Sequence, residues 1–259
     1  MADGLAAFDR PSETLGWARE AINDLNLTLT GFFNNQPFST VIEPDPETGH
    51  EVHKIKLLTP IPNGVPRRAT EALNNVKNAF DQTTFAACAA IGKRPKKDIH
   101  FPWRLNPTDL ERVFDKKDAV IPPELRDVFR GHQPYPTGEG YSGGDDGIRE
   151  VARIANLKHT VGLGITGRVP MMRWPDVSHA SFVRAPMPRW DPVKNEMILL
   201  IVDAGAKVKH NHEVAFYVAL NEPGPLEGEP ILGALSAFLQ KAEQVLIDLK
   251  LCCTALGAR

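Results

Sequence analysis

Two histidines, His210 and His212, have a spacing that could hold a metal ion. On a β-strand, residues i and i+2 face the same side, so both imidazoles would reach one transition-metal ion. His159 and His179 lie on neighbouring predicted elements, and either could supply a third ligand for a metal-dependent hydrolase. The competing interpretation is the polar end of a hairpin, because 204–214 has the pattern strand, turn, strand. We favour the hairpin and expect neither a bound metal nor a cofactor.

A second candidate site is a basic run followed by an aromatic residue. It consists of Lys93, Arg94, Lys96 and Lys97, with Trp103 just beyond. Basic charge beside an aromatic ring is typical of contacts with single-stranded nucleic acid. A solvated loop between two helices has the same composition, and we favour that interpretation. The run therefore supplies candidates for RNA contact without establishing a site.

Two other motifs are incomplete. Gly162, Gly164 and Gly167 have the spacing of a dinucleotide-binding turn, but a helix is predicted before them and none directly after them. We expect these glycines to be small residues in a strand or a bulge. Asp145 and Asp146 are expected to form an acidic loop rather than a cation site. The chain has no Walker-type phosphate loop and no nucleophile elbow, which excludes the commonest ATPases, GTPases and serine hydrolases.

Composition narrows the class of protein further. The chain has 259 residues, of which 42% are hydrophobic and 24% are charged, as in ordinary globular proteins. The net charge of −2 makes nucleic-acid binding by overall charge improbable, although a local basic face stays open. Cys88, Cys252 and Cys253 are expected to be buried free thiols. No leader is recognisable, and no run approaches the roughly 18 apolar residues of a membrane span, so we expect a cytoplasmic protein.

Hydrophobic periodicity predicts the elements that would position these residues. Helices are expected over 12–27 with Ser12 as N-cap, over 66–91, 146–158 and 226–251, and after Asn106-Pro107 and Pro122-Pro123. Strands are expected at 38–42, 52–58, 161–165, 197–202 and 214–220, and a long glycine-rich loop at 131–147. This order predicts an α+β fold in which a helical bundle packs on one antiparallel sheet and a long C-terminal helix closes the structure. We expect a single domain over 1–259, with its helical part at about 64–158 and the sheet plus C-terminal helix at about 160–253.

The segment from Ala69 to Thr160 resembles an uncharacterised family of bacterial and phage proteins. In that family a helix phrase like L-R-S-A-L-D-H-L precedes an F-P phrase, a Q-P-Y turn and a D-K-H-R phrase. The matching stretches here are VKNAFDQT at 76–83, Phe101-Pro102, Gln133-Pro134-Tyr135 and NLKHT at 156–160. The resemblance covers about a third of the chain and implies an organisation, because the family has no assigned activity.

The family's helix phrase is also similar to the R-x4-6-H signature of HEPN ribonucleases, which dimerise to place two Arg/His pairs around an RNA phosphate. In that arrangement arginine stabilises phosphate charge and histidine exchanges a proton. The matching positions here are Lys77 and Gln82, so the resemblance implies weak or absent catalysis. We expect Lys77, Asp81 and Gln82 to form instead a polar contact with Lys158 and His159 that ties two helices together.

Three functions stay open on the sequence alone. The one we favour is a non-catalytic binding or assembly protein that works as a homo-oligomer. The second is a HEPN-like RNA-binding protein or a ribonuclease, either active or inactive. The third is the metal-dependent hydrolase built on the histidines. We expect binding rather than catalysis because no complete catalytic constellation is recognisable.

Overall fold

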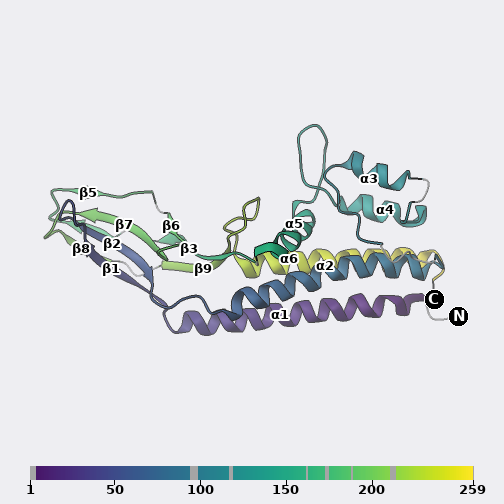
Figure 1. Ribbon diagram of the computed structural model, residues 1–259, viewed down its shortest axis with the longest axis horizontal. Coiled ribbons are helices and arrows are strands. Elements are labelled where there is room, and N and C mark those ends of the chain that lie inside the picture. Colours follow the sequence, from purple (N-terminus) through teal and green to yellow (C-terminus); the bar gives the residue numbers. More distant parts are fainter. Residues whose placement is uncertain are drawn as a thin grey trace.

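The computed structural model describes residues 4–93, 99–116, 119–161, 163–172, 175–187, 189–210 and 214–258. The molecule is elongated, with helices at one end and β-strands at the other (Figure 1). This arrangement confirms the predicted α+β class and its long C-terminal helix. Among the described helices, none combines the length and the apolar character that crossing a membrane requires.

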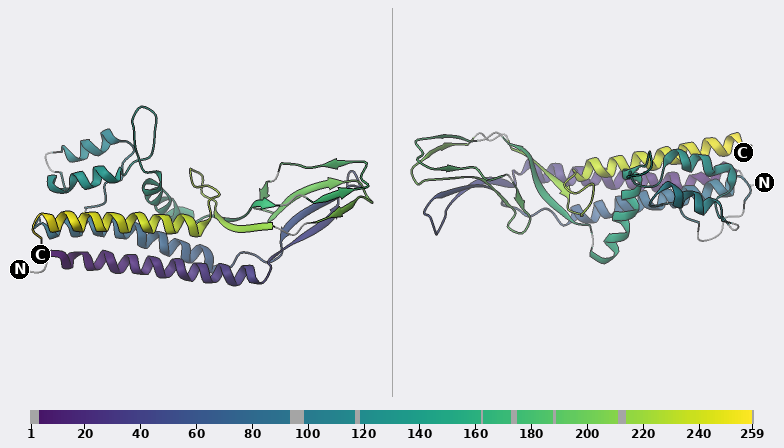
Figure 2. Two further views of the ribbon diagram at one scale, coloured as in Figure 1. Left: turned by 180° about the vertical axis from the view of Figure 1, so that it is seen from behind. Right: turned by 90° about the horizontal axis from the view of Figure 1, so that it is seen from above.

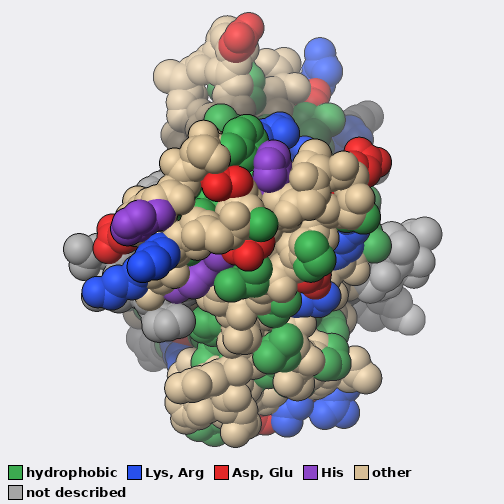
Figure 3. Space-filling view, turned by 90° about the vertical axis from the view of Figure 1, so that its left-hand side faces the viewer, with side chains coloured by type: hydrophobic (Ala, Val, Ile, Leu, Met, Phe, Trp, Pro, Cys, Tyr) green, Lys and Arg blue, Asp and Glu red, His purple; other side chains and the backbone are tan. Residues whose placement is uncertain are grey.

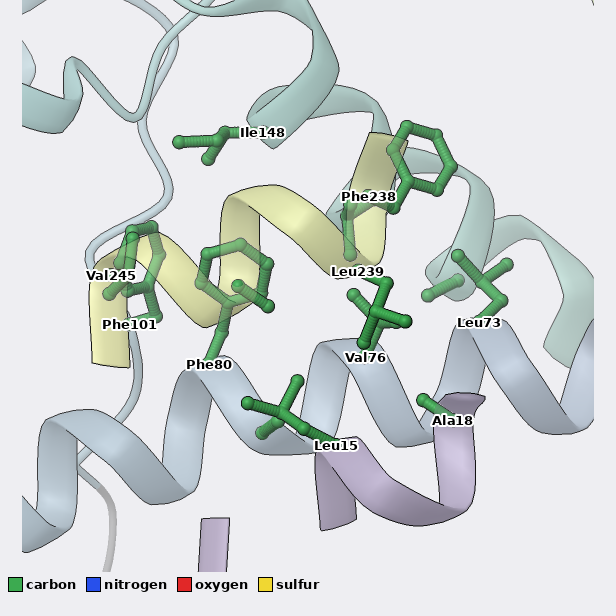
Figure 4. Close-up of a cluster of buried hydrophobic side chains, with 14 of the residues drawn as sticks. Leu15, Ala18, Leu73, Val76, Phe80, Phe101, Ile148, Phe238, Leu239 and Val245 are labelled. Atoms are coloured by element: carbon green, nitrogen blue, oxygen red, sulfur yellow. The ribbon is translucent and has the colours of Figure 1, made fainter. Parts of the chain in front are cut away.

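Three long helices run side by side and form a bundle (Figures 1 and 2). They are α1 (Asp9–Asn34), α2 (Gly64–Ala90) and α6 (Ile231–Ala255), and a short 3-10 turn, η1 (Gly4–Phe8), precedes α1. Each helix buries one stripe of apolar residues at helical spacing. Figure 4 shows Leu15 of α1, Val76 of α2 and Leu239 of α6 facing one another in this core. Full burial of such a side chain stabilises the fold by about 1.5–3 kcal/mol.

Helix α1 is longer than predicted at both ends. Ser12 lies inside its first turns rather than capping it, and its hydroxyl donates to the Phe8 carbonyl oxygen at 2.7 Å. At the other end Leu29 and Phe32 are buried and continue the apolar stripe. Their packing against the bundle outweighs the low helix propensity of Gly31 between them.

Three shorter helices cover one side of the bundle (Figure 1). They are α3 (Pro107–Phe114), α4 (Pro123–His132) and α5 (Asp146–Val161). Proline opens α3 and α4 as predicted, and the Asn106 side chain caps α3 by accepting from the Asp109 N–H at 2.8 Å.

The long loop between α4 and α5 is anchored to its surroundings. The Asp145 N–H donates to the carbonyl oxygens of Gln133 and Tyr135, and the Tyr135 side chain is buried. The Asp145 carboxylate forms an ion pair with Lys241 of α6. Asp146 accepts hydrogen bonds at the loop's other side, which leaves the acidic pair in a structural role.

All strand pairs of the described chain are antiparallel, but they form three sheets rather than the single one predicted. The largest sheet has the order β1 (Phe38–Pro44), β2 (Glu51–Leu57), β7 (Glu196–Val202) and β5 (Val183–Arg184), and β6 (Trp190–Asp191) also pairs with β7. The other two sheets pair β3 (Ile165–Met172) with β9 (Val214–Leu220), and β4 (Asp176–Ser178) with β8 (Lys207–Lys209). The predicted strand at 161–165 is wrong, because Val161 still belongs to α5 and the strand begins at Ile165.

The sheets extend from the end of the bundle, so helices and sheets meet end to end (Figure 2). Val218 and Leu220 of β9 reach into the helical core. The five-stranded sheet buries a separate cluster made of Ile55, Met197, Leu199, Leu200 and Val202. Each end of the molecule therefore has its own apolar core.

Candidate functional site

An extended strap, residues 99–104, crosses α2 and forms one wall of a cleft. Its Phe101 ring is buried against Phe80 of α2, with 4.7 Å between the ring centroids, and against Trp103, at 4.6 Å (Figure 4). The Phe101 N–H donates to Oδ1 of Asp81 at 2.9 Å. The aromatic contacts and this hydrogen bond together fix the strap on α2.

The second oxygen of Asp81 lies close to a lysine and a histidine at the cleft. Asp81 Oδ2 lies 3.4 Å from Lys77 Nζ, one helical turn away, and 3.4 Å from His100 Nδ1 on the strap. Asp81 thus neutralises part of the positive charge and sets the position of the strap.

Gln82 faces the other side of α2. Its Oε1 accepts a hydrogen bond from the Thr14 hydroxyl of α1 at 2.8 Å. The structure therefore brings Lys77, Asp81 and Gln82 into polar contacts, with the strap and α1 as partners. The side chains of Lys158 and His159 lie outside the described residues, so the predicted contact with them stays a prediction.

The cleft between the strap, α2, α5 and the segment after α3 has a volume of about 490 Å³. Lys77, Arg104 and Arg149 line it together with His100, and Asp81 is the one carboxylate among its lining residues that the structure describes. Three permanent cations against one carboxylate give the cleft a net positive charge. A cleft of this sign concentrates anions.

Arg104 and Arg149 have no ion pair with any described carboxylate. The Arg104 guanidinium donates to the Trp103 carbonyl oxygen, and no described residue holds the Arg149 guanidinium. Burial lowers the pKa of Arg104, and the charge of Asp109 opposes this shift. A partly buried guanidinium without a carboxylate partner gains most from an anionic ligand, because the ligand replaces the water that burial removed.

Of the basic run, Lys93 pairs with Glu124 at 3.7 Å, while Arg94, Lys96 and Lys97 lie outside the described residues. Trp103 lines the cleft. Arg149 was missed by sequence reasoning, because nothing near it in the chain marks it, and only the packing of α5 on α2 brings it to the cleft.

Comparison of this chain with protein-family models, with curated proteins and with solved structures gives no match. The chemistry of the cleft is therefore the main support for a functional proposal.

The histidines that could have formed a metal site lie only partly within the described residues. His210 Nε2 lies 2.9 Å from Nδ1 of His53 on β2, whereas His179 is exposed beside Ser178. His212 lies outside the described residues. Histidine side chains are visible at this end of the molecule, beside basic and acidic groups (Figure 3). No group of three or more potential metal ligands occurs among the residues that were placed.

His53 predicts a loss of stability in mild acid. It is 1% exposed, and burial lowers its pKa below the ordinary value of 6.5, while Glu51 opposes this shift. Below pH 6.5 the unfolded chain therefore takes up a proton that the folded chain resists, so the free energy of unfolding falls as the pH falls. Urea unfolding at pH 7.5 and 5.5 should show this loss, and His53→Leu should reduce the difference. The control variant His179→Asn changes an exposed histidine and should leave the difference in unfolding free energy between the two pH values unchanged. If both variants show the same difference, His53 is not the cause of the acid sensitivity.

Two glycines of the motif lie in or beside a strand, as expected. Gly167 lies inside β3, where a Cβ would collide with the ring of Phe216, and Gly164 lies just before the strand. Gly162 lies outside the described residues. Gly167 therefore serves close packing inside the strand.

The three cysteines are free, and two of them are buried. Burial raises the pKa of the Cys88 thiol to about 12 and that of Cys253 to about 11. Both thiols are protonated at neutral pH, which makes them poor nucleophiles and poor metal ligands.

Proposed function

We propose that the protein binds single-stranded RNA in the cleft without cleaving it. The observation that carries this proposal is the pair of guanidinium groups, Arg104 and Arg149, that line the cleft without a described carboxylate partner. The planar guanidinium fork matches two oxygens of a phosphate group, which makes arginine the preferred residue for phosphate recognition.

The sequence just before the strap favours a ligand with several phosphates over a single small anion. Four of the five residues at 93–97 are Lys or Arg, and Asp98 separates them from the strap at Ile99. The Lys93–Glu124 pair compensates one of these charges. A polyanionic strand gains from each further cation, because each neutralised phosphate releases counterions.

The size of the cleft favours a single strand. Its volume of about 490 Å³ is that of a site for a small molecule, which suits a nucleotide or two but not a duplex. Trp103 in the cleft wall supplies the aromatic component that proteins binding single strands commonly use. The resemblance of this chain to a family whose helix phrase is similar to that of HEPN ribonucleases favours RNA over DNA.

Binding without cleavage follows from the residues at the two HEPN positions. Lys77 is paired with Asp81, and Gln82 accepts a hydrogen bond from Thr14. Glutamine does not exchange protons at neutral pH, and lysine lacks the bidentate fork of arginine.

Fluorescence anisotropy with a labelled oligouridylate of about ten nucleotides tests this proposal. We expect the association constant to fall as salt rises, with a log–log slope of about −0.7 for each phosphate that the protein neutralises. Arg149→Gln should make the slope shallower by about 0.7. Arg67→Gln, on an exposed part of α2 away from the cleft, is the matched control and should leave the slope unchanged. No binding at about 50 mM salt, or binding that salt does not affect, would overturn the proposal.

A further inference from the structure

A second hollow adjoins the cleft across α2. It has a volume of about 360 Å³, and it shares Asp81 and His100 with the cleft. Its remaining lining is mostly apolar and consists of Ala7, Arg10, Pro11, Gln82, Phe85 and Ile99. We infer, on the basis of the proposed RNA binding, that this pocket holds one base of the strand and prefers a base with a ring carbonyl group.

Phe85 is the residue that suits this pocket to a base. The ring is 44% exposed, and no other described aromatic ring stacks on it. The buried side chains of Pro11 and Ile99 complete an apolar lining. An apolar site with an unstacked ring gains affinity from one stacked base.

Gln82 supplies the polar contact that distinguishes one base from another. Oε1 of the amide lies 2.8 Å from the Thr14 hydroxyl, so Nε2 is the amide atom left for a ligand when that hydroxyl donates to Gln82. No described residue accepts from Nε2, and Gln82 lines the pocket. An N–H donor matches the carbonyl oxygen of uracil, cytosine or guanine, whereas adenine carries no carbonyl group.

His100 links the pocket to the cleft. Its side chain is exposed at the junction of the two hollows, next to Asp81. A strand with its base against Phe85 would carry its phosphates past His100 towards Arg104 and Arg149. The apolar pocket and the cationic cleft thus match the two parts of a nucleotide chain.

The experiment compares oligouridylate with oligoadenylate of equal length on the wild-type protein and on variants. We expect Phe85→Ala to weaken binding of oligouridylate by about tenfold, since stacking on a ring is lost, with no change in the salt slope. Phe85→Tyr should restore most of the affinity because it restores the ring. Ile247→Ala, an apolar residue of similar exposure on α6, should have no effect.

Gln82→Met tests the base preference separately. In this variant the ratio of the affinity for oligouridylate to that for oligoadenylate should fall from about fivefold towards one, because only the contact with the base carbonyl is lost. The Thr14 hydroxyl keeps a partner in this variant, since it also lies 3.0 Å from the Arg10 carbonyl oxygen.

The outcomes separate the two proposals. If the wild-type protein binds neither RNA, the proposed function fails. If it binds RNA with the expected salt dependence but Phe85→Ala binds equally well, the pocket holds no base and this inference alone is overturned. An unchanged affinity ratio in Gln82→Met overturns the carbonyl preference.

Discussion

A variant that carries both Arg104→Gln and Arg149→Glu is expected to bind oligouridylate about 100-fold more weakly than the wild-type protein at low salt. Arg104→Gln removes a partly buried positive charge from the cleft. Arg149→Glu adds a second carboxylate to a cleft in which Asp81 is the one described carboxylate. A 100-fold change corresponds to about 2.8 kcal/mol, which is within the range measured when buried charge contacts are removed from an interface.

The control for this variant must change the net charge by the same amount. Arg67→Gln combined with Arg184→Glu does so at two exposed positions away from the cleft. Anisotropy titrations in parallel should show wild-type affinity for this control to within about twofold. Equal losses in both double variants would mean that RNA responds to overall charge, and the cleft would then have no special part in binding.

Phe101→Ala is expected to have the largest effect on stability. The ring is buried and contacts Phe80, Trp103 and Phe129. Deleting a buried phenylalanine ring costs about 3–5 kcal/mol, which is a large part of the roughly 5–15 kcal/mol that stabilises a typical domain. Urea unfolding followed by circular dichroism measures the loss. RNA affinity should fall as well, because the strap also carries Arg104.

Phe101→Leu shows how much of the stability loss in Phe101→Ala comes from lost side-chain volume and how much from loss of the aromatic ring. It keeps most of the apolar contacts and should cost less than half as much as the alanine variant. A loss below about 1 kcal/mol for Phe101→Ala would show that the strap leaves α2 without disturbing the core.

The helices could be predicted well because their signal is local. In α2 the apolar stripe through Leu73, Val76 and Phe80 is visible in the sequence, and its ends differ from the prediction by only one or two residues. The extension of α1 to Asn34 could not be predicted in this way, because Leu29 and Phe32 become buried only when α2 and α6 are in place.

The sequence predicted most of the strands, but it did not predict which strands pair with one another. The hairpin of β1 and β2 joins β7, which lies about 140 residues further along the chain. Periodicity shows which residues alternate and contains no information on which strand lies alongside. The same limit applies to the histidines. The spacing of His210 and His212 suggested that these two side chains act together, whereas His210 lies against His53 of β2, far away in the sequence.

For the candidate site, the sequence identified the polar residues of α2 but not the residues that they contact in the folded protein. Lys77, Asp81 and Gln82 were expected to form a polar group, and on α2 they take part in polar contacts. Their contacts with the strap and with α1, and the arrival of Arg149, depend on tertiary packing. The homo-oligomer and the metal-dependent hydrolase stay predictions.

The separation of the two apolar cores has a consequence for cooperativity. The five-stranded sheet depends on a small cluster around Ile55 and Leu200, and the helical core does not include that cluster. A fluctuation that opens the sheet therefore leaves most contacts of α1, α2 and α6 intact. Backbone amides of β2 and β7 should exchange with solvent through partial opening, whereas those in the middle of α2 should require global unfolding. If the amides exchange in this way, the two cores unfold separately, and a ligand bound between the strap and α2 would stabilise only the helical one.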